Sequence, residues 1–82
     1  MQIVNVNNAG KQFAKPGSEI KVGDVLVHSY GELSDVLEFV KETATTVVFV
    51  IQERTKTHRH PEGYRCEKRF KKTALQPVKV NQ

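Results

Sequence analysis

The chain has 82 residues, of which 38% are hydrophobic and 27% are charged, and its formal net charge at pH 7 is +4. A chain of this length forms one domain with a modest core, and its composition is too apolar for general disorder. It has no run of about 18 apolar residues, so we expect no membrane-spanning helix. The single cysteine, Cys66, excludes an internal disulfide, and together with the lack of a signal-peptide pattern it favours a cytoplasmic protein.

The first predicted element is a short strand within residues 1–8, where Ile3, Val4 and Val6 lie among Gln and Asn. The Asn-Asn-Ala-Gly sequence that follows is a turn signal. Residues 11–18 end in Pro-Gly-Ser and are predicted to form a loop, with Phe13 as its anchor. We therefore expect one domain over residues 1–82, with residues 1–18 as a strand and loop ahead of a barrel over residues 19–80.

The middle of the chain predicts two further strands. Gly23 and Asp24 mark a tight turn, Val25–Val27 forms a short apolar strand, and residues 29–34 form a loop. The apolar residues within Asp35–Lys41 have the spacing of a helix, but they also fit a strand with a bulge. Because the segment is short for a helix and lies among β-branched runs, we predict a strand.

A long hairpin is predicted from Thr46 to Lys72. It begins with the apolar run Thr46–Ile51 after a four-residue loop, and it turns at Pro61-Glu62-Gly63. Pro77 breaks regular structure beyond the hairpin, so a turn followed by an edge strand, Val78–Val80, is expected at the end.

Together these elements predict an all-β fold, a small SH3-like barrel of five to six strands with a long basic β-hairpin. An OB-like barrel is the alternative, but that fold needs a helix between its third and fourth strands, and the sequence offers none there. The predicted core consists of Val25, Val27, Phe39, Val47, Phe49, Ile51 and Phe70.

Residues 20–51 resemble a family of small, uncharacterised phage- and plasmid-encoded proteins with an SH3-like β fold. The similarity lies in Val22-Gly23-Asp24-Val25-Leu26, Ser29-Tyr30-Gly31, Glu38-Phe39-Val40 and the apolar strand Thr46–Ile51. The chain departs from the family pattern at Glu32-Leu33-Ser34, where a more polar turn is typical. The resemblance implies an SH3-like fold and a mobile-element origin, and it implies no activity and no functional residue.

The charge is unevenly distributed along the chain. Residues 1–49 hold four Lys/Arg and six Asp/Glu, a sum of −2, whereas residues 50–82 hold nine and three, a sum of +6. If the hairpin turn is centred on Pro61 and Glu62, Arg54 faces Arg69, and this repulsion is relieved by an anion. We therefore predict a non-enzymatic module that binds nucleic acid, DNA or RNA, through a cationic face with Tyr64 stacking at the tip. The predicted site is Arg54, Lys56, His58, Tyr64, Arg65, Arg69 and Lys71.

Two other interpretations remain open for the charged segments. The acidic stretch that follows the residue 29–34 loop suggests a protein-interaction module, for example a phage-encoded factor that modulates or inhibits a host protein assembly. Its predicted contact residues are Tyr30, Glu32, Leu33, Asp35 and Glu38. In that case the basic hairpin binds an acidic protein surface, or it is only a solvated strand face that prevents aggregation.

Neither catalysis nor a cofactor is predicted. The sequence has no nucleophile elbow, no Gly-rich phosphate loop and no Ser/His/Asp set in a recognisable context. His58, His60 and Cys66 are zinc-type ligands, but they number three, and the assumed register places Cys66 and His58 on opposite faces of the hairpin. We therefore predict no metal site.

Overall fold

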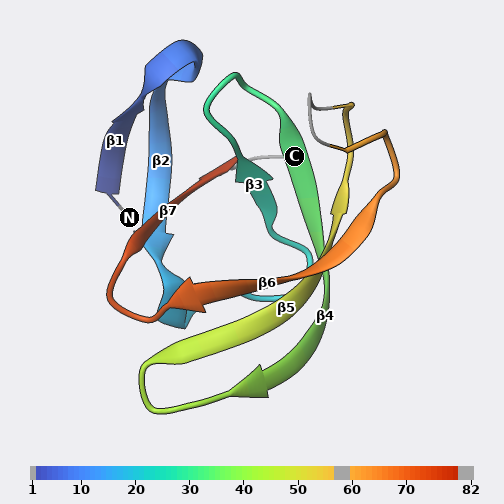
Figure 1. The fold of residues 1–82 in the computed structure, drawn as a ribbon. Coiled ribbons are helices and arrows are strands. Elements are labelled where there is room, and N and C mark those ends of the chain that lie inside the picture. Colours follow the sequence, from blue (N-terminus) through green and yellow to red (C-terminus); the bar gives the residue numbers. More distant parts are fainter. Residues whose placement is uncertain (1, 57–59, 80–82) are drawn as a thin grey trace.

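The computed structural model describes residues 2–56 and 60–79 as one strongly curved antiparallel sheet (Figure 1). The sheet order is β1-β2-β7-β3-β4-β5-β6. The all-β prediction is confirmed, and no helix in the described part of the chain is long and apolar enough to cross a membrane. The elements are β1 (Gln2–Val6), the 3₁₀ turn η1 (Asn7–Ala9), β2 (Gly10–Pro16), the 3₁₀ turn η2 (Gly17–Glu19), β3 (Val25–Val27), β4 (Leu33–Glu42), β5 (Thr46–Glu53), β6 (Arg65–Lys71) and β7 (Leu75–Lys79).

The N-terminal strand is confirmed, but the prediction of a loop over residues 11–18 is wrong. Gly10–Pro16 forms β2, which pairs with β1 on one side and with β7 on the other and brings the described strands to seven. Three of its seven residues have polar side chains and it carries only one large apolar side chain, Phe13, so its hydrophobic pattern is weak. Pairing along both edges stabilises it instead, and Phe13 lies in the ladder, 43% exposed, between Ile3 and Val78.

The strand predicted within Asp35–Lys41 is confirmed as part of β4. Its pairing with β5 shifts register twice, between Val36 and Glu38 and between Phe39 and Lys41. Each bulge places one extra residue in β4 and interrupts the inward–outward alternation of the side chains. These two interruptions explain why the apolar residues of a strand have helix-like spacing.

The predicted register of the long hairpin is wrong. Thr46 pairs with Lys71 and Gln52 with Arg65, so Arg69 lies opposite Val48 rather than opposite Arg54. The Pro61–Tyr64 turn exists, but it folds back on the end of β5, where the Glu53 N–H donates to the Tyr64 carbonyl at 2.8 Å. The connection from β5 to β6 is therefore longer than a tight turn, and the inferred repulsion between Arg54 and Arg69 does not arise.

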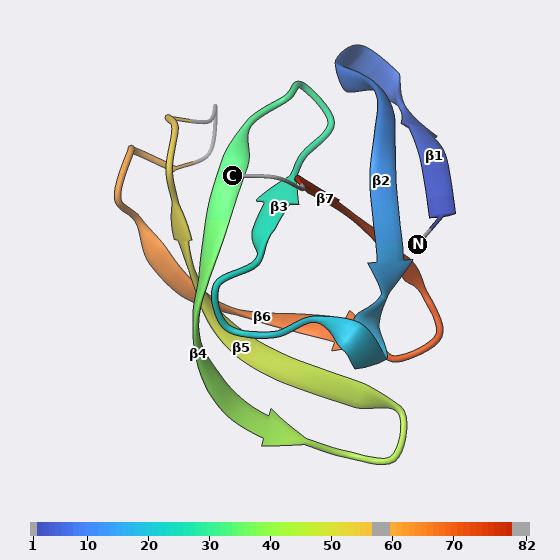
Figure 2. The same ribbon diagram turned by 180° about the vertical axis from the view of Figure 1, so that it is seen from behind.

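The last strand was predicted at a sheet edge, and this is also wrong. β7 lies between β2 and β3, and Val78 is 3% exposed (Figure 2). Pro77 is tolerated there because pairing with β3 covers only Val78 and Lys79, so the proline stands just outside that ladder. Val80, the predicted end of the strand, lies outside the described residues. The edges of the described sheet are β1 and β6.

The core lies inside the curve of the sheet. Six predicted core residues are buried: Val25, Val27, Val47, Phe49, Ile51 and Phe70. The prediction is wrong for the seventh, Phe39, which is 49% exposed. Its ring packs edge-on against Phe49, with the ring centroids 5.7 Å apart. The core residues that the sequence did not single out include Ile20, Leu26, Val36 and Val78.

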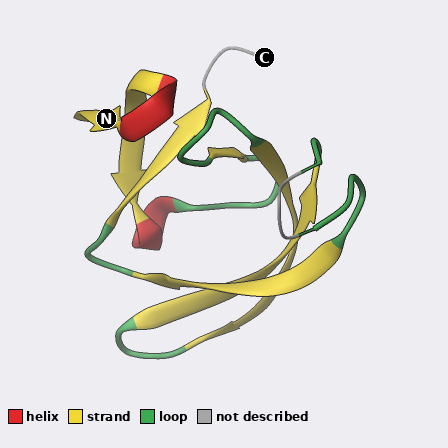
Figure 3. Ribbon diagram, turned by 45° about the horizontal axis from the view of Figure 1, so that its top comes forward, coloured by secondary structure: helices red, strands yellow, loops and turns green. Residues whose placement is uncertain are grey.

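The turn η2 joins the N-terminal part of the sheet to the end of β6 (Figure 3). The Gly17 N–H donates to the Ala74 carbonyl at 3.0 Å, and the Ser18 N–H donates to the Lys72 carbonyl at 3.2 Å. A β-carbon on Gly17 would stand 2.2 Å from the Lys71 carbonyl oxygen. Only glycine therefore allows this approach between two segments that are distant in the sequence.

Candidate binding pocket and cationic strand

A pocket of about 440 Å³ lies between the loop that joins β3 to β4 and the inner side of β5 and β6. Its size falls within the range of pockets that hold small molecules. Ile51 and Cys66, which pair across β5 and β6, form its apolar wall. The titratable side chains of its lining, besides Cys66, are His28, Tyr30, Glu32, Glu53, His60, Glu67 and Lys68.

The loop between β3 and β4 is held closed by its own backbone. The His28 N–H donates to the Glu32 carbonyl at 2.8 Å, and the Gly31 N–H donates to the His28 carbonyl at 2.9 Å. Gly31 adopts φ +84°, a conformation that favours glycine. The tight turn places His28 over the sheet and leaves Tyr30 67% exposed at the rim of the pocket.

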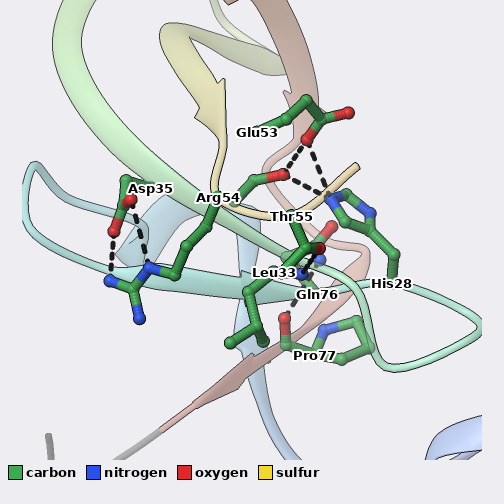
Figure 4. A network of polar contacts seen from close by, with 9 residues as sticks. His28, Leu33, Asp35, Glu53, Arg54, Thr55, Gln76 and Pro77 are labelled. Carbon is green, nitrogen blue, oxygen red and sulfur yellow. Dashed lines mark hydrogen bonds and ion pairs between the residues drawn. The ribbon is translucent and has the colours of Figure 1, made fainter. Parts of the chain in front are cut away.

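A hydrogen-bonded network of His28, Ser34 and Glu53 lies beside the pocket (Figure 4). Ser34 is completely buried, and its hydroxyl donates to Glu53 Oε1. The His28 Nε2 atom lies 2.6 Å from Ser34 Oγ and 3.8 Å from Glu53 Oε1. Because the one hydroxyl hydrogen is directed to Glu53, His28 Nε2–H is the donor to Ser34, and His28 Nδ1 is not used by the network.

The environment of the network keeps His28 neutral. Burial lowers the pKa of His28 below its ordinary value of 6.5, the Lys68 charge lowers it further, and the Glu53 and Glu32 carboxylates oppose the shift. Burial is the largest of these effects, because a half-buried imidazolium loses hydration that a neutral ring does not need. At neutral pH the ring therefore offers an unprotonated Nδ1.

This arrangement differs from a nucleophilic triad. A serine nucleophile donates its proton to a histidine and reaches the substrate with its oxygen. Ser34 instead donates to a carboxylate, and its side chain is fully buried. The network therefore positions Glu53 and His28 as hydrogen-bonding groups rather than activating Ser34.

Glu53 keeps one oxygen for other partners. Glu53 is 7% exposed, and its Oε1 accepts a hydrogen bond from the Ser34 hydroxyl. Its Oε2 makes no hydrogen bond or ion pair within the described structure. Every fully buried side-chain oxygen in the described residues has a hydrogen-bond partner. Oε2 has none, so it is accessible to solvent. Figure 4 shows this oxygen and the second ring nitrogen of His28 directed away from the network. Because Glu53 lines the pocket, the solvent reaches it from there.

Aromatic rings stand at the mouth of the same pocket. The rings of His60 and Tyr64 stack in parallel, with centroids 3.9 Å apart and an interplanar angle of 2°. His60 and Tyr30 line the pocket, whereas Tyr64 lies outside its lining and is 38% exposed. Flat aromatic surfaces of this kind suit a planar ligand.

The cationic surface gathers on β6, an edge strand of the sheet. Its seven residues include four cations and one carboxylate, Glu67, so the strand carries a net charge of +3. Within residues 2–56 and 60–79, none of these cations forms an ion pair with a carboxylate. The four cations are Arg65, Lys68, Arg69 and Lys71.

Charges on the outer face of the sheet lie in bands across the strands, because direct partners in an antiparallel pair share a face. Lys41 and Arg69 flank Val48, and Glu38 and Glu67 flank Val50 in the next row. Val48 is only 3% exposed although it faces outward, which is the expected effect of long aliphatic stems lying over it. The cationic strip is therefore interrupted at Glu67.

The structure separates the residues of the predicted cationic site. Arg65, Arg69 and Lys71 alternate along β6 and share its outer face with Glu67. Arg54 lies beyond β5 and donates to Asp35, with Nη2 2.5 Å from Oδ1, a pair that raises the pKa of Arg54 through the hydrogen bond and the nearby charge. Lys56 is exposed beyond the end of β5, Tyr64 stacks on His60, and His58 lies outside the described residues.

The acidic residues proposed as a protein contact do not form one patch. Glu32 and Tyr30 belong to the pocket, whereas Asp35 is engaged by Arg54. Glu38 is exposed on the outer face of β4, and Leu33 is partly buried opposite Val27. The described residues contain no group of three His, Cys, Asp or Glu side chains arranged to hold a metal ion.

The floor of the pocket was not predicted from the sequence, although a signal for it is present. Val47, Phe49 and Ile51 alternate inward along β5, and the next inward position is Glu53. Ser34 lies opposite Glu53 on β4 and is also buried. A carboxylate that continues a buried apolar alternation indicates a polar site at the end of a core, because a buried charge needs partners.

Comparison with known proteins adds no relative. No protein-family model matches the chain, and no curated protein or solved structure matches it either. Function is therefore argued from the pocket and from β6.

Proposed function

We propose that this protein is a non-enzymatic binding module for single-stranded nucleic acid, DNA or RNA, and that β6 is its phosphate-binding strand. The observation that carries the proposal is the net charge of +3 on β6, whose four cations have no carboxylate partner in the described structure. Cations paired with carboxylates attract phosphate less, and Arg54, Lys15 and Lys72 are paired in this way.

A single strand suits this surface better than a duplex. A seven-residue strand is about 23 Å long and so spans several nucleotides. Exposed rings lie beside it, in Tyr30 and in the stacked pair of His60 and Tyr64. Proteins that bind single strands combine a cationic track with rings on which the bases stack.

A salt titration of oligonucleotide binding tests the proposal. With three to four phosphate contacts on a single strand, the slope of log affinity against log salt concentration is expected to be about −2 to −3. Fluorescence anisotropy of a labelled single strand measures it directly. No binding at low salt, or an affinity that does not change with salt, would overturn the proposal.

The double charge reversal Arg65→Glu/Arg69→Glu is expected to abolish this binding and leave the fold intact, since both side chains are exposed. The matched control is Lys11→Glu/Lys21→Glu, which makes the same change in net charge at exposed positions outside β6. If both double variants lose affinity equally, the effect comes from total charge rather than from β6.

A second candidate function is supported by the outer edge of β6, which pairs with no further strand of residues 2–56 and 60–79. An extended acidic segment of a partner protein would add to β6 as a further strand, with its carboxylates beside the cations. A hollow of about 230 Å³ lies along the same edge, between β6 and the turn into β7, and would take a side chain. A module of this kind fits a factor that modulates or inhibits a host assembly. Acidic peptides that compete with the oligonucleotide would favour it.

The SH3-like character of the sheet belongs to the same proposal, together with the resemblance to phage- and plasmid-encoded proteins. The strong curvature of the sheet and the antiparallel run β3-β4-β5-β6 support an SH3-like arrangement. A cytoplasmic location is also proposed, because the one cysteine is unpaired and partly buried.

A further inference from the structure

The floor of the pocket presents two hydrogen-bond acceptors, one from β5 and one from the loop between β3 and β4. Glu53 Oε2 is the uncommitted oxygen of a carboxylate that is more than nine-tenths buried at the end of β5. His28 Nδ1 is the ring nitrogen that remains once Nε2 donates to Ser34. The Ser34 hydroxyl fixes both side chains, so the acceptors are positioned before any ligand arrives.

Two acceptors on the floor of one pocket suit a ligand edge with two adjacent donors. Among the common bases, guanine alone presents neighbouring N–H donors on its pairing edge, at N1 and at the exocyclic N2. Adenine and cytosine place an acceptor next to their amino group, and uracil and thymine place one donor between two acceptors. A mismatched edge would leave a buried carboxylate oxygen facing an acceptor, which is strongly unfavourable.

The rest of the pocket also fits a guanine. Tyr30 and His60 supply ring surfaces for stacking, and Ile51 supplies an apolar wall. Lys68 lines the pocket as well, with its ammonium nitrogen over the Phe70 ring, 5.7 Å from the ring centroid, and its charge acts on His28. The carbonyl oxygen O6 of guanine is an acceptor next to N1, and a lysine donor suits it.

We propose that the pocket binds one guanine base of the single strand, with Glu53 Oε2 and His28 Nδ1 accepting from its N1–H and N2–H groups, Lys68 donating to O6 and Tyr30 stacking on the ring. The inference rests on the proposed function. Because the pocket lies on the inner side of β6 and three of the four cations lie on its outer face, the single strand would pass over the β6 edge between that base and the bound phosphates. It adds a sequence preference, which phosphate contacts alone do not give.

Titration of the whole chain with free mononucleotides tests the pocket apart from β6. Guanosine monophosphate is expected to shift the NMR signals of His28 and Tyr30 and to bind about tenfold or more tightly than the adenosine, cytidine and uridine monophosphates, as expected for two-point recognition of a base. Equal affinity for all four nucleotides, or no shift at His28 and Tyr30, would overturn the inference.

Three variants sharpen this test. Glu53→Gln removes the carboxylate and is expected to abolish the preference for guanosine monophosphate, whereas Glu38→Gln makes the same charge change on the outer face and is expected to keep it. Should Glu53→Gln fail to fold, Tyr30→Ala decides the matter, because Tyr30 is 67% exposed in a loop. Its guanosine monophosphate affinity is expected to fall about tenfold through the lost stacking, and an unchanged affinity would contradict the inference.

The same variants separate the pocket from the phosphate site. If the inference is right, Glu53→Gln lowers the affinity of guanine-containing oligonucleotides to that of other sequences and leaves the salt slope unchanged. If wild-type protein binds all oligonucleotides equally with a steep salt slope, the guanine pocket is wrong and the function proposed for β6 stands. If guanosine monophosphate binds selectively but oligonucleotides do not bind, the single-strand function is wrong, and the pocket remains as a guanine nucleotide site.

Discussion

At the scale of single residues, the fold depends on a few positions where one atom decides whether two segments meet. Gly17 lies where η2 passes the end of β6, and a β-carbon there would overlap the Lys71 carbonyl oxygen at 2.2 Å. Asp24 is a second such position. Its carboxylate accepts from the Lys21 N–H at 2.9 Å and pairs with the nearly buried Lys15 at 2.7 Å, which ties β2 to the turn before β3.

Gly17→Ala is therefore expected to destabilise the protein strongly. The Lys71 carbonyl belongs to the backbone and cannot turn aside like a flexible side chain, so the strands must shift by a sizeable fraction of an ångström. We expect a loss of about 2 kcal/mol or more in the free energy of unfolding, the range typical of overpacking. Urea denaturation measures it. Ser18→Ala, an exposed neighbour, is the control and should change stability by less than about 0.5 kcal/mol. Equal stability of the two variants would contradict the close approach.

Phe49→Ala and Phe39→Ala form a matched pair. Phe49 is 4% exposed and packs between Phe39 and Phe70, with ring centroids 5.7 Å and 6.2 Å away, whereas Phe39 is 49% exposed. Removing the buried ring is expected to cost about 3–5 kcal/mol, most of the stability of so small a domain. Removing the exposed ring should cost clearly less. A cooperative, stable Phe49→Ala protein in thermal unfolding would show that β5 is not central to the core.

At the scale of elements, His28 links the β3–β4 loop to β4 and β5 and makes stability depend on pH. Burial holds the folded-state pKa of His28 below its ordinary value of 6.5. The unfolded chain therefore binds the proton more readily, and the stability from the neutral ring is complete above about pH 6.5 and is lost as the pH falls through that value toward the folded pKa. His28→Gln lacks this dependence. Between pH 8 and pH 5.5, the urea midpoint should decrease more in the wild type than in His28→Gln. Equal decreases in the two proteins would contradict the role assigned to His28.

The elements also show what the sequence can predict. Val25–Val27 and the apolar run of β5 were predictable because their apolar residues are continuous, and Gly23 and Asp24 also mark the turn before Val25. β2 was not, because pairing on both sides stabilises it and one of its partners, β7, is distant in the sequence. The hairpin register was not predictable either, since the Pro61–Gly63 signal marks a turn within a long connection rather than its apex.

The candidate site was predictable only in part. Arg65, Arg69 and Lys71 alternate along one strand whatever its register, so their shared face followed from the sequence. The neutralisation of Arg54 by Asp35 did not, because it depends on where β4 and β5 end relative to each other. The pocket floor needs His28, Ser34 and Glu53 from three parts of the chain, and only the three-dimensional register of β3, β4 and β5 brings them together.

At the scale of the whole molecule, the sheet has two edges in its described part, β1 and β6, and they are protected differently. β1 is short and mostly exposed, whereas β6 is a longer strand that carries cations at four of its seven positions. An unpaired edge invites another strand, and charged side chains along it oppose pairing between identical copies. The charge of β6 thus serves two purposes. It attracts an anionic partner, and it prevents two copies of this chain from joining edge to edge.

Arg69→Thr/Lys71→Thr tests this second purpose. Threonine favours strands and carries no charge, so the variant keeps the edge but removes the repulsion between two copies of it. We expect self-association that rises with concentration in sedimentation velocity, beyond that of the wild type. Lys11→Thr/Lys21→Thr, with the same change in net charge away from β6, is expected to behave like the wild type. If all three proteins sediment alike across the concentration range, the cations of β6 are not needed to protect the edge, and anion binding alone accounts for their position.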